Sequence, residues 1–469
     1  MYKIDTIFKA YDIRGIYPDE INKDIAYKVG RAAGKFFNAQ FEDKSFRPRA
    51  KKEKNIALAR DNRLPSEELF QAVREGIKDE GINVMDVGLV ITPIFCFSVI
   101  KFKLDGGIMV TASHNPKEYN GFKIIKKNAL PLNPKESDTL KEILIRGDFS
   151  KKSSGGHIAI KKEVINDYID AILELSHVNE IASYKIVIDT ANGVSGVIVP
   201  ELKKHLKNAE IVGLFNELDG SFPNHDPNPI YPQNTKSLQE RVLSEHADLG
   251  IAFDGDGDRI LFIDENGERI DPDLIAATII RYYFKRAGKV LYTAVTSRIV
   301  REEALDSGNE VVCSRIGHTF IKETMEREKV IFGCEASGHY YFQDTYYVES
   351  PLLVLFKIME AMSKSKMTLS ALVGQLQKFY QNRTDFKIKN ISEADNYIKR
   401  VEVRYKKISR FGRLPNIFYI DGLTVEYTDW WFNLRASNTE PVIRLTIEAD
   451  TEELLVEKTQ EIRQFIGLD

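Results

Sequence analysis

One serine stands beside one histidine in the segment Gly107–Pro116, where a short apolar run gives way to a turn. The run Ile108–Val110 predicts a buried strand, and the turn signal Asn115-Pro116 ends it. A side chain at such a strand end lies at the edge of a sheet, which is where open α/β folds bind their ligands. Ser113 and His114 are therefore candidates for chemistry, although an ordinary turn can also contain such a pair.

Three carboxylates at alternate positions form a second candidate site, in Asp254-Gly-Asp256-Gly-Asp258-Arg259. The two glycines let the backbone bend so that the carboxylates converge. Converging carboxylates repel one another unless a cation neutralises them, and oxygen ligands suit Mg²⁺. An EF-hand calcium loop is an alternative because Glu265 falls at its last ligand position, but Arg259 stands where that loop needs glycine. An acidic turn without a metal is the other alternative.

Three further segments combine groups that suit a sugar phosphate. The loop Arg435–Pro441 offers a guanidinium group, two hydroxyls and an amide, all able to donate to phosphate oxygens. The loop Glu335–His339 offers a carboxylate, a hydroxyl and an imidazole, and a carboxylate can accept from two neighbouring sugar hydroxyls. The segment Phe8–Gly15 contributes Tyr11 and Arg14. Taken singly, each segment also fits a surface turn or an edge segment.

The elements that must position these residues follow a repeated pattern. A run of strand-forming residues ends in small or polar residues and precedes a helical stretch, and this occurs three times. Alternating strands and helices predict a partly parallel sheet with helices on its faces, and hence three related mixed-sheet α/β domains. The three pairs are Asn55–Asp61 with Pro65–Glu80, Ile186–Asp189 with a helical stretch to about Leu206, and Val290–Thr293 with Ser297–Leu305.

The last part of the chain differs, since it predicts several strands followed by a helix. The expected strands are Phe418–Ile420, Thr424–Tyr427, Trp431–Leu434 and Val442–Glu448. Asp450, with Glu453 three residues later, is expected to cap the helix. We therefore expect an α+β domain at the C-terminus and four domains in all, over residues 1–153, 154–267, 268–376 and 377–469.

Composition gives no sign of a nucleic-acid or membrane partner. The chain has 469 residues, 43% of them hydrophobic, and a net charge of −3. Its longest apolar run, Leu89–Ile100, is too short for a membrane span and contains Pro93. The three scattered cysteines and the N-terminus, which lacks the apolar core of a signal peptide, favour a cytoplasmic protein. The oligomeric state is left open between monomer and homodimer.

Four motifs stand in one order along the chain: Thr111-Ala-Ser113-His114-Asn115-Pro116, Asp254-Gly-Asp256-Gly-Asp258-Arg259, Glu335-Ala-Ser337-Gly-His339 and Arg435-Ala-Ser437-Asn438-Thr439. Together they resemble the α-D-phosphohexomutase superfamily, and specifically its phosphomannomutase/phosphoglucomutase branch. The resemblance covers essentially the whole chain. It implies a heart-shaped enzyme of four domains, with one motif from each domain lining a central cleft.

The resemblance also implies a role for each motif. Ser113 is expected to carry a phosphoryl group, one oxygen of which holds Mg²⁺ together with Asp254, Asp256 and Asp258. The other expected catalytic residues are His114, Lys123, Arg259, His339 and Arg14. The expected substrate-binding residues are Tyr11, His318, Glu335, Ser337, His339, Arg435, Ser437, Asn438 and Thr439.

The expected reaction interconverts hexose 1-phosphate and hexose 6-phosphate, with mannose or glucose as the sugar. The phosphoserine gives its phosphoryl group to the free sugar hydroxyl. The resulting hexose 1,6-bisphosphate, which also serves as primer, reorients and returns its other phosphoryl group to Ser113. Positioning and charge stabilisation carry such a transfer. Lys123 and His339 are both candidates for the base that accepts the hydroxyl proton.

The chain departs from the family pattern in two places. It has Gly333-Cys334 where relatives often have two glycines before the selecting glutamate, which predicts a loop of altered flexibility. It also lacks a lysine in Ala294–Arg298, which leaves the sugar preference open. A magnesium-dependent phosphatase and a non-catalytic sugar-phosphate sensor remain alternatives from other classes. A phosphoglucosamine mutase is less favoured because its serine loop usually differs from the segment Lys117–Lys123.

Overall fold

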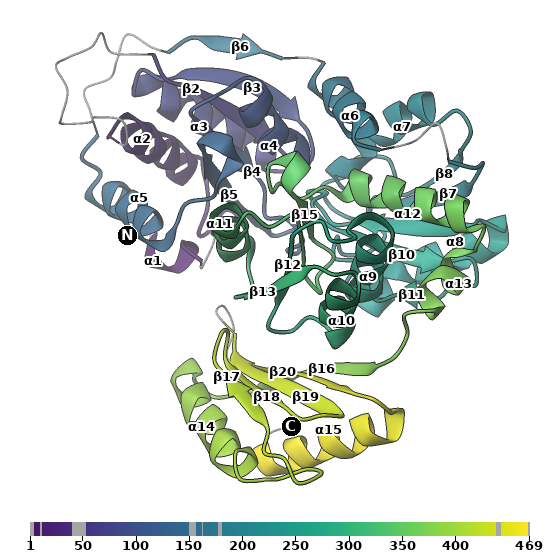
Figure 1. Cartoon of the computed structure of the whole chain (residues 1–469). Coiled ribbons are helices and arrows are strands. Elements are labelled where there is room, and N and C mark those ends of the chain that lie inside the picture. Colours follow the sequence, from purple (N-terminus) through teal and green to yellow (C-terminus); the bar gives the residue numbers. More distant parts are fainter. Residues whose placement is uncertain are drawn as a thin grey trace. The chain divides into compact units, whose positions relative to one another are not determined.

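The computed structural model describes residues 4–9, 12–39, 53–149, 156–161, 163–176, 181–437 and 442–467 (Figure 1). The chain divides into two compact units. Unit 1 consists of Met1–Ile270 and Ser337–Leu372, and unit 2 consists of Asp271–Ala336 and Val373–Asp469. None of the helices within the described ranges has the length and apolar character needed to cross a membrane.

The first sheet of unit 1 has six strands in the order β1-β5-β4-β2-β3-β6. The neighbours among β4, β2, β3 and β6 are parallel, whereas β5 runs antiparallel to β4 and β1. The strands are β1 (Ile13–Ile16), β2 (Asn55–Arg60), β3 (Asn83–Leu89), β4 (Gly106–Val110), β5 (Tyr119–Lys126) and β6 (Ile158–Ile160). The helices of this part are α1 (Ile4–Ile7), α2 (Lys23–Ala39), α3 (Ser66–Asp79), α4 (Thr92–Lys101), α5 (Pro134–Arg146) and the 3₁₀ turn η1 (Lys127–Ala129).

Strand β4 separates two layers of helices. A Cβ atom on Gly106 would lie 2.6 Å from Phe37 of α2, whereas one on Gly107 would lie 2.6 Å from Phe95 of α4. Because successive residues of a strand point to opposite faces, α2 and α4 cover opposite faces of the sheet (Figure 1). Every residue of β4 is buried, as expected for a strand covered on both sides. Ser113 follows shortly after the carboxyl end of this strand.

The second sheet of unit 1 has the order β11-β10-β9-β7-β8. β7 is parallel to β8 and β9, and β10 is antiparallel to β9 and β11. The strands are β7 (Lys185–Asp189), β8 (Glu210–Leu214), β9 (Leu249–Phe253), β10 (Ile260–Asp264) and β11 (Arg269–Ile270). The helical elements are α6 (Val164–Glu174), η3 (Val194–Val197), α7 (Val199–His205), η4 (Pro232–Thr235) and α8 (Lys236–Glu245).

The expected helical stretch to Leu206 is two elements, η3 and α7, rather than one helix. Pro200 lies in the first turn of α7, where its missing N–H costs nothing but where it cannot continue a preceding helix. The first of the expected strand–helix pairs is confirmed by β2 and α3, with the ends displaced by one residue.

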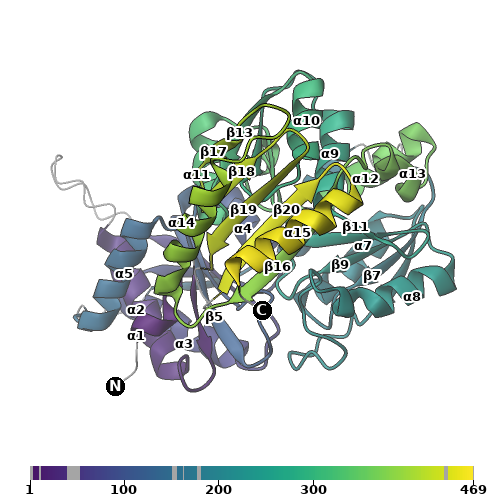
Figure 2. The same cartoon turned by 90° about the horizontal axis from the view of Figure 1, so that it is seen from below.

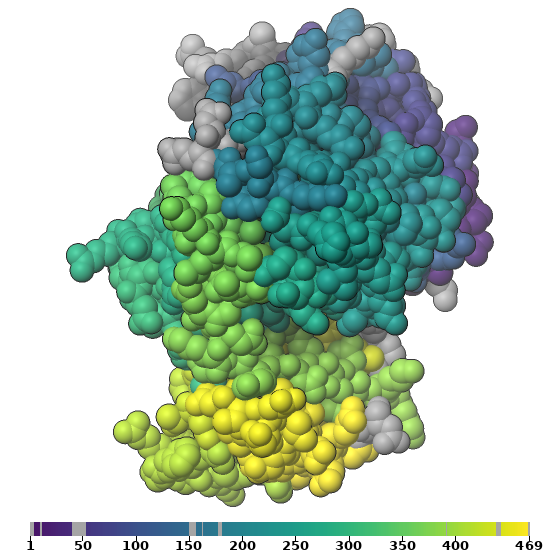
Figure 3. All heavy atoms as spheres, turned by 90° about the vertical axis from the view of Figure 1, so that its right-hand side faces the viewer, coloured from purple at the N-terminus to yellow at the C-terminus, as the bar shows by residue number. Residues whose placement is uncertain are grey.

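The segment Ser337–Leu372 completes unit 1. It contains β15 (Tyr340–Phe342), η5 (Gln343–Thr345), α12 (Pro351–Ser365) and the first residues of α13 (Leu369–Gly374). Ser363 Oγ accepts a hydrogen bond of 2.9 Å from the Ala182 amide and lies 2.9 Å from the hydroxyl of Tyr184. Ser370 bonds to the carboxylate of Glu265. Figure 3 shows this green segment lying along the teal surface of the second sheet's domain.

The N-terminal part of unit 2 is an α/β domain. Strand β12 pairs in parallel with β13 and with β14. The strands are β12 (Lys289–Thr293), β13 (Glu310–Ser314) and β14 (Phe332–Cys334), and the helices are α9 (Pro272–Tyr283), α10 (Arg298–Asp306) and α11 (His318–Glu328). The strand–helix pair expected here is confirmed by β12 and α10, where Ser297 caps the helix by accepting from the Ile299 amide.

The C-terminal part of unit 2 is an antiparallel sheet in the order β16-β20-β19-β18-β17. Helices α14 (Ala394–Tyr405) and α15 (Glu452–Ile466) cover one face of it (Figure 2), and their apolar side chains share a core with those of the sheet. The strands are β16 (Tyr380–Lys387), β17 (Asn416–Phe418), β18 (Leu423–Glu426), β19 (Trp430–Ala436) and β20 (Val442–Ala449), with the short turn η6 (Ile391–Glu393) before α14.

The fold class expected from the sequence is confirmed, but three details of the last domain are wrong. The strand expected at Phe418–Ile420 is β17, which ends at Phe418 because the hairpin loop begins at Tyr419. Thr451, not Asp450, caps α15, since its side chain accepts from the Leu454 amide at 3.2 Å. The expectation also omitted β16 and α14.

Candidate active site

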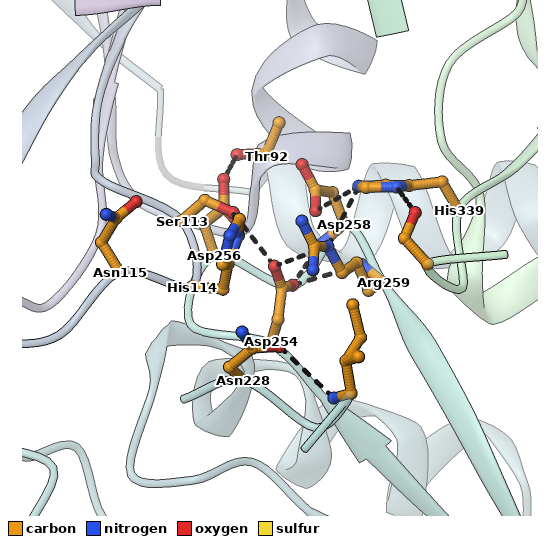
Figure 4. Close-up of polar contacts among 12 residues, drawn as sticks. Thr92, Ser113, His114, Asn115, Asn228, Asp254, Asp256, Asp258, Arg259 and His339 are labelled. Atoms are coloured by element: carbon orange, nitrogen blue, oxygen red, sulfur yellow. Dashed lines mark hydrogen bonds and ion pairs between the residues drawn. The ribbon is translucent and has the colours of Figure 1, made fainter. Parts of the chain in front are cut away.

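Ser113 is buried in the loop after β4, where this loop contacts the loop after β9, and it has a backbone φ of 51°. This left-handed conformation is unfavourable for a residue with a side chain, so the surrounding structure must hold it. The hydroxyl donates to Asp254 Oδ2 at 3.1 Å and lies 3.1 Å from Nδ1 of His114 (Figure 4). The turn serine expected from the sequence therefore faces the aspartate motif.

The three aspartates converge as expected. One oxygen of each of Asp254, Asp256 and Asp258 lies within 4.8 Å of the others, and all three side chains are buried. Asp254 Oδ1 accepts from the backbone N–H groups of Asp258 at 3.1 Å and Arg259 at 3.2 Å, which closes the loop. Strands β9 and β10 flank the aspartate motif, and they make an EF-hand incompatible with the fold because that motif needs helices there.

The two glycines of the aspartate motif do different things. Gly257 has a φ of 70°, so it provides the bend that the sequence predicted. Gly255 instead allows a close approach, since a Cβ atom there would lie 2.4 Å from the carbonyl oxygen of Ser113. The missing side chain thus lets the aspartate loop lie directly against the serine loop.

Lys123 places a cation between two of these carboxylates. Its Nζ donates to Asp256 Oδ2 at 2.7 Å and to Asp258 Oδ2 at 2.6 Å. Burial alone would lower the pKa of Lys123, but these two carboxylates raise it well above its usual value. Burial alone would raise the pKa of Asp258, but Lys123 holds it well below its usual value.

Asp254 is the carboxylate least compensated by positive charge. Burial, together with the carboxylates of Asp258 and Asp256, raises the pKa of Asp254 to about 8. One further atom is unsatisfied: Asp256 Oδ1 is buried and has no hydrogen-bond partner within the described residues. The carboxylates therefore have both the charge and an open ligand atom for a cation.

Arg259 and His339 lie on the side of the triad away from Ser113 (Figure 4). Arg259 Nε is 3.6 Å from Asp254 Oδ2 and 3.4 Å from His339 Nε2. His339 Nε2 lies 3.1 Å from Asp258 Oδ1, and its Nδ1 lies 2.8 Å from the hydroxyl of Ser337. His339 of the third motif therefore contacts the aspartate triad within unit 1, and Ser337 contacts His339.

Two arginine side chains donate hydrogen bonds to the serine loop. Arg63 Nη2 donates to the carbonyl oxygens of Ser113 at 2.7 Å and Asn115 at 2.6 Å. Its Nη1 donates to two more carbonyl oxygens of the same loop, at Pro116 and Tyr119. Arg14 Nη1 donates to the Asn115 side chain at 2.7 Å.

The burial of His114 and the nearby arginines change the pKa of its imidazole. Burial, followed by the positive charges of Arg259 and Arg14, lowers the pKa of His114 well below its usual value. Its imidazole is therefore neutral near pH 7 and, beside Ser113, can accept or share a proton.

The remaining expected residues lie in unit 2 or outside the described residues. His318 begins α11, and the buried Glu335 accepts from the Gly317 amide at 3.1 Å. Arg435 lies near the end of β19, and the buried Ser437 follows it. Cys334 lies within β14, before the loop, and burial raises the pKa of its thiol well above its usual value. Tyr11, Asn438 and Thr439 are outside the described residues.

Sequence reasoning missed Arg63 and Thr92, which contact the serine loop and the aspartate loop. Arg63 follows β2, and Thr92 follows β3. Both strands run parallel to β4, so their carboxyl ends meet at the edge where Ser113 lies. Each lies three positions after the end of its strand, which was the available signal, but the sequence does not show which strands become neighbours.

Comparison with known proteins agrees with this geometry. Family models of phosphoglucomutase/phosphomannomutase match the chain in succession: α/β/α domain I at residues 5–151, domain II at 166–267, domain III at 271–380 and the C-terminal domain at 387–464. A phosphomannomutase of Salmonella montevideo is 33% identical over 474 residues, covering 98% of this chain and 99% of that protein.

Two other relatives give the same result. A phosphomannomutase of Methanocaldococcus jannaschii is 34% identical, covering 98% of this chain and 97% of that protein. The crystal structure of a phosphoglucomutase/phosphomannomutase family protein from Burkholderia thailandensis superposes with a TM-score of 0.86 at 28% identity, covering 99% of this chain and 98% of the other. The chain belongs to the phosphomannomutase/phosphoglucomutase branch of the α-D-phosphohexomutase superfamily and is a hexose phosphate mutase.

Proposed function

We propose that this enzyme interconverts hexose 1-phosphate and hexose 6-phosphate through a phosphoserine at Ser113 and a hexose 1,6-bisphosphate intermediate. The observation that carries the proposal is the 3.1 Å contact between the Ser113 hydroxyl and Asp254. A serine that faces a cluster of carboxylates suits phosphoryl transfer once a cation neutralises that cluster. Mannose and glucose are the proposed sugars, and the phosphomannomutase names of the relatives support mannose.

The residues of the triad fit Mg²⁺. All the donors are carboxylate oxygens, which Mg²⁺ prefers, and the orphaned Asp256 Oδ1 is a buried ligand atom without a partner among the described residues. Asp254, Asp256 and Asp258 would hold the ion with one oxygen of the phosphoserine. A bound cation supplies positive charge that offsets the negative charge of the transferring phosphoryl group.

The proposed phosphoryl transfer has two steps, and the sugar phosphate and the phosphoserine are its only reactants. The free hydroxyl oxygen of the sugar phosphate forms a bond to the phosphorus on Ser113, the bond from phosphorus to Ser113 Oγ breaks, and the hydroxyl proton passes to a base. The bisphosphate then turns end for end, Ser113 Oγ forms a bond to the other phosphorus, the bond from that phosphorus to the sugar oxygen breaks, and the sugar oxygen takes up the proton. Lys123 and His339, which both contact Asp258, remain the candidates for the base, and the raised pKa of Lys123 favours His339.

The other residues bind, orient and stabilise charge. We propose that Arg259 lies beside the transferring phosphoryl group, that Arg14 and His114 flank the serine, and that Tyr11, His318, Glu335, Ser337, His339, Arg435, Ser437, Asn438 and Thr439 bind the substrate. The support is the residue-by-residue match to the family motifs and, for Arg14, His114 and Ser337, the contacts described above.

The four-part division at residues 1–153, 154–267, 268–376 and 377–469 is part of this proposal. We also propose that the partners are small sugar phosphates rather than nucleic acid. The proposed location is the cytoplasm, and the proposed state is monomeric or homodimeric. The scattered positions of the three cysteines support a reducing compartment.

The test is an assay of the purified protein on mannose 1-phosphate and glucose 1-phosphate, with a trace of hexose 1,6-bisphosphate and Mg²⁺. Formation of the 6-phosphates supports the proposal. Release of inorganic phosphate without isomerised sugar would instead show a phosphatase, and binding without turnover would show a sensor.

A further inference from the structure

The Asp256 carboxylate accepts hydrogen bonds from two residues of the first sheet's domain, Thr92 and Lys123. Thr92 Oγ1 donates to Asp256 Oδ2 at 2.6 Å, and the Thr92 amide donates to the Asp256 carbonyl oxygen at 2.8 Å (Figure 4). The two residues are 164 positions apart in the sequence. Thr92 therefore makes hydrogen bonds to both the side chain and the backbone of Asp256.

The contact is well shielded and well fixed. Thr92 is 4% exposed and is the first residue of α4, followed by Pro93. The residue before it, Ile91, packs on the same loop, because a Cβ atom on Gly257 would lie 2.6 Å from Ile91 Cγ2. The start of α4 thus lies against the aspartate loop and cannot move independently of it.

The hydrogen bonds divide the two oxygens of Asp256 between two tasks. Oδ2 accepts from both the Thr92 hydroxyl and the Lys123 ammonium group. Oδ1 is buried and has no partner among the described residues. A carboxylate fixed through one oxygen presents the other in a set direction, which is how outer residues orient metal ligands.

We propose that Thr92 is a positioning residue of the metal site, which directs Asp256 Oδ1 toward the cation. The inference rests on the proposed Mg²⁺ site and adds to it a residue outside the four motifs. Without the Thr92 hydroxyl, Lys123 alone holds Asp256 Oδ2, and the carboxylate gains freedom about its side-chain torsions. Binding of the cation must then also order the Asp256 carboxylate, which weakens the measured affinity.

The decisive variant is Thr92→Val, which removes the hydroxyl, keeps the shape and leaves the backbone bond to Asp256 intact. We expect the Kd for Mg²⁺ to rise by about 10–100-fold, the range for lost outer partners of a metal ligand. Thr92→Ser, which restores the hydroxyl, should bind Mg²⁺ within about threefold of the original chain. Thr92→Ala serves as a second hydroxyl-free variant if Thr92→Val is not recovered folded, with the same expected weakening.

The matched control is Thr278→Val. Thr278 is also fully buried, and its hydroxyl donates at 2.8 Å to the carbonyl oxygen of Leu274, within helix α9. This variant also loses one buried threonine hydrogen bond, but the acceptor is a backbone carbonyl oxygen within helix α9 and not a carboxylate of the triad. Its thermal stability should fall, while its Kd for Mg²⁺ should stay unchanged.

The measurement is a calorimetric titration of the chelator-stripped full chain with MgCl₂, together with the Mg²⁺-induced rise in the unfolding midpoint. A Kd for Thr92→Val equal to that of the original chain would overturn the role of Thr92 while leaving the Mg²⁺ site in place. An equal rise of the Kd for Mg²⁺ in Thr278→Val would show that the effect comes from lower stability in general, and it would also overturn the role of Thr92. No binding of Mg²⁺ to the original chain would overturn the metal site itself, and the inference with it.

Discussion

Lys123 Nζ lies 2.6 Å from Asp258 Oδ2, although 135 positions separate the two residues in the sequence. The lysine comes from β5 in the first sheet's domain, and the aspartate follows β9 in the second. Both side chains are buried, at 10% and 4% exposure. The ammonium group therefore offsets the repulsion among carboxylates that the chain brings together on folding.

Removal of this ammonium group should destabilise the metal-free protein. In Lys123→Met the buried carboxylates of Asp256 and Asp258 lose the ammonium group that pairs with them, and breaking a buried pair in this way costs about 3–5 kcal/mol. We expect the free energy of unfolding in a chelator to fall by that amount, and added Mg²⁺ to restore part of it.

Denaturant unfolding with and without Mg²⁺ measures this effect. Lys126→Met is the control, because Lys126 forms a more exposed pair with Glu136 and its removal should cost about 1 kcal/mol or less. Equal losses in the two variants would refute the neutralising role of Lys123.

Arg63 should matter for the rate of reaction more than for substrate affinity. Its guanidinium group donates to the carbonyl oxygens of Ser113, Asn115, Pro116 and Tyr119, so one side chain fixes the whole serine loop. A lysine cannot make this forked set of bonds. In Arg63→Lys we expect kcat to fall by about 10²-fold, as for a small misplacement of a reacting group, with a smaller change in KM.

Steady-state kinetics and amide hydrogen exchange of the serine loop test this prediction. Exchange in Arg63→Lys should quicken over residues 111–121 and stay slow in the core strands. Arg74→Lys, which changes a part-exposed arginine paired with Asp86, is the control and should leave both readouts unchanged. An unchanged kcat in Arg63→Lys would contradict the prediction.

The sequence was sufficient for the aspartate site but not for its supports. Asp254, Asp256 and Asp258 lie within five residues, so local spacing and two glycines already imply convergence. The contact of Arg63 with Ser113 spans 50 positions, and the contact of Thr92 with Asp256 spans 164. Such contacts depend on which strands become neighbours in the sheets, and no local pattern contains that information.

The missed elements of the last domain have a similar explanation. Strand β16 has only one buried residue, Phe386, so it shows no alternation of apolar and polar residues. It forms because β20 offers an edge to pair with. Helix α14 buries only Ala394, Val401 and Tyr405, which gives a weak helical pattern. In both elements the tertiary partner supplies what the local sequence lacks.

Asp256→Asn should weaken metal-dependent activity. The substitution keeps the shape but removes one negative charge from the ligand set, and loss of a key electrostatic group typically costs about 10²–10³-fold in kcat. Activity measured against Mg²⁺ concentration should also require more metal for half-maximal rate. Full activity in the presence of a strong chelator, in either protein, would refute the assignment of a metal to the triad.

His225 and Asp189 predict a pH-dependent contribution to stability. His225 Nε2 lies 3.1 Å from Asp189 Oδ2. Burial alone would lower the pKa of His225, but the bond to Asp189 raises it above its usual value. A folded-state pKa above the unfolded one means that this stabilisation is fully present below about pH 6.5 and is lost as the pH rises through the folded pKa.

The measurement compares the original chain with His225→Gln in denaturant unfolding. The stability difference between them should be larger at about pH 6 than at about pH 9. A difference that is constant, or that grows with pH, would show that the imidazole is not charged in the folded protein.

The phosphoserine is the central claim, and one measurement tests it directly. The full chain is incubated with Mg²⁺ and glucose 1,6-bisphosphate labelled in its phosphates, and the label is located by peptide mass spectrometry. We predict one phosphoryl group on Ser113, its transfer to unlabelled hexose 1-phosphate on addition of that substrate, and no stable label in Ser113→Ala. A Ser113→Ala variant that isomerises the substrate at the original rate, or a label on a different residue, would contradict the account.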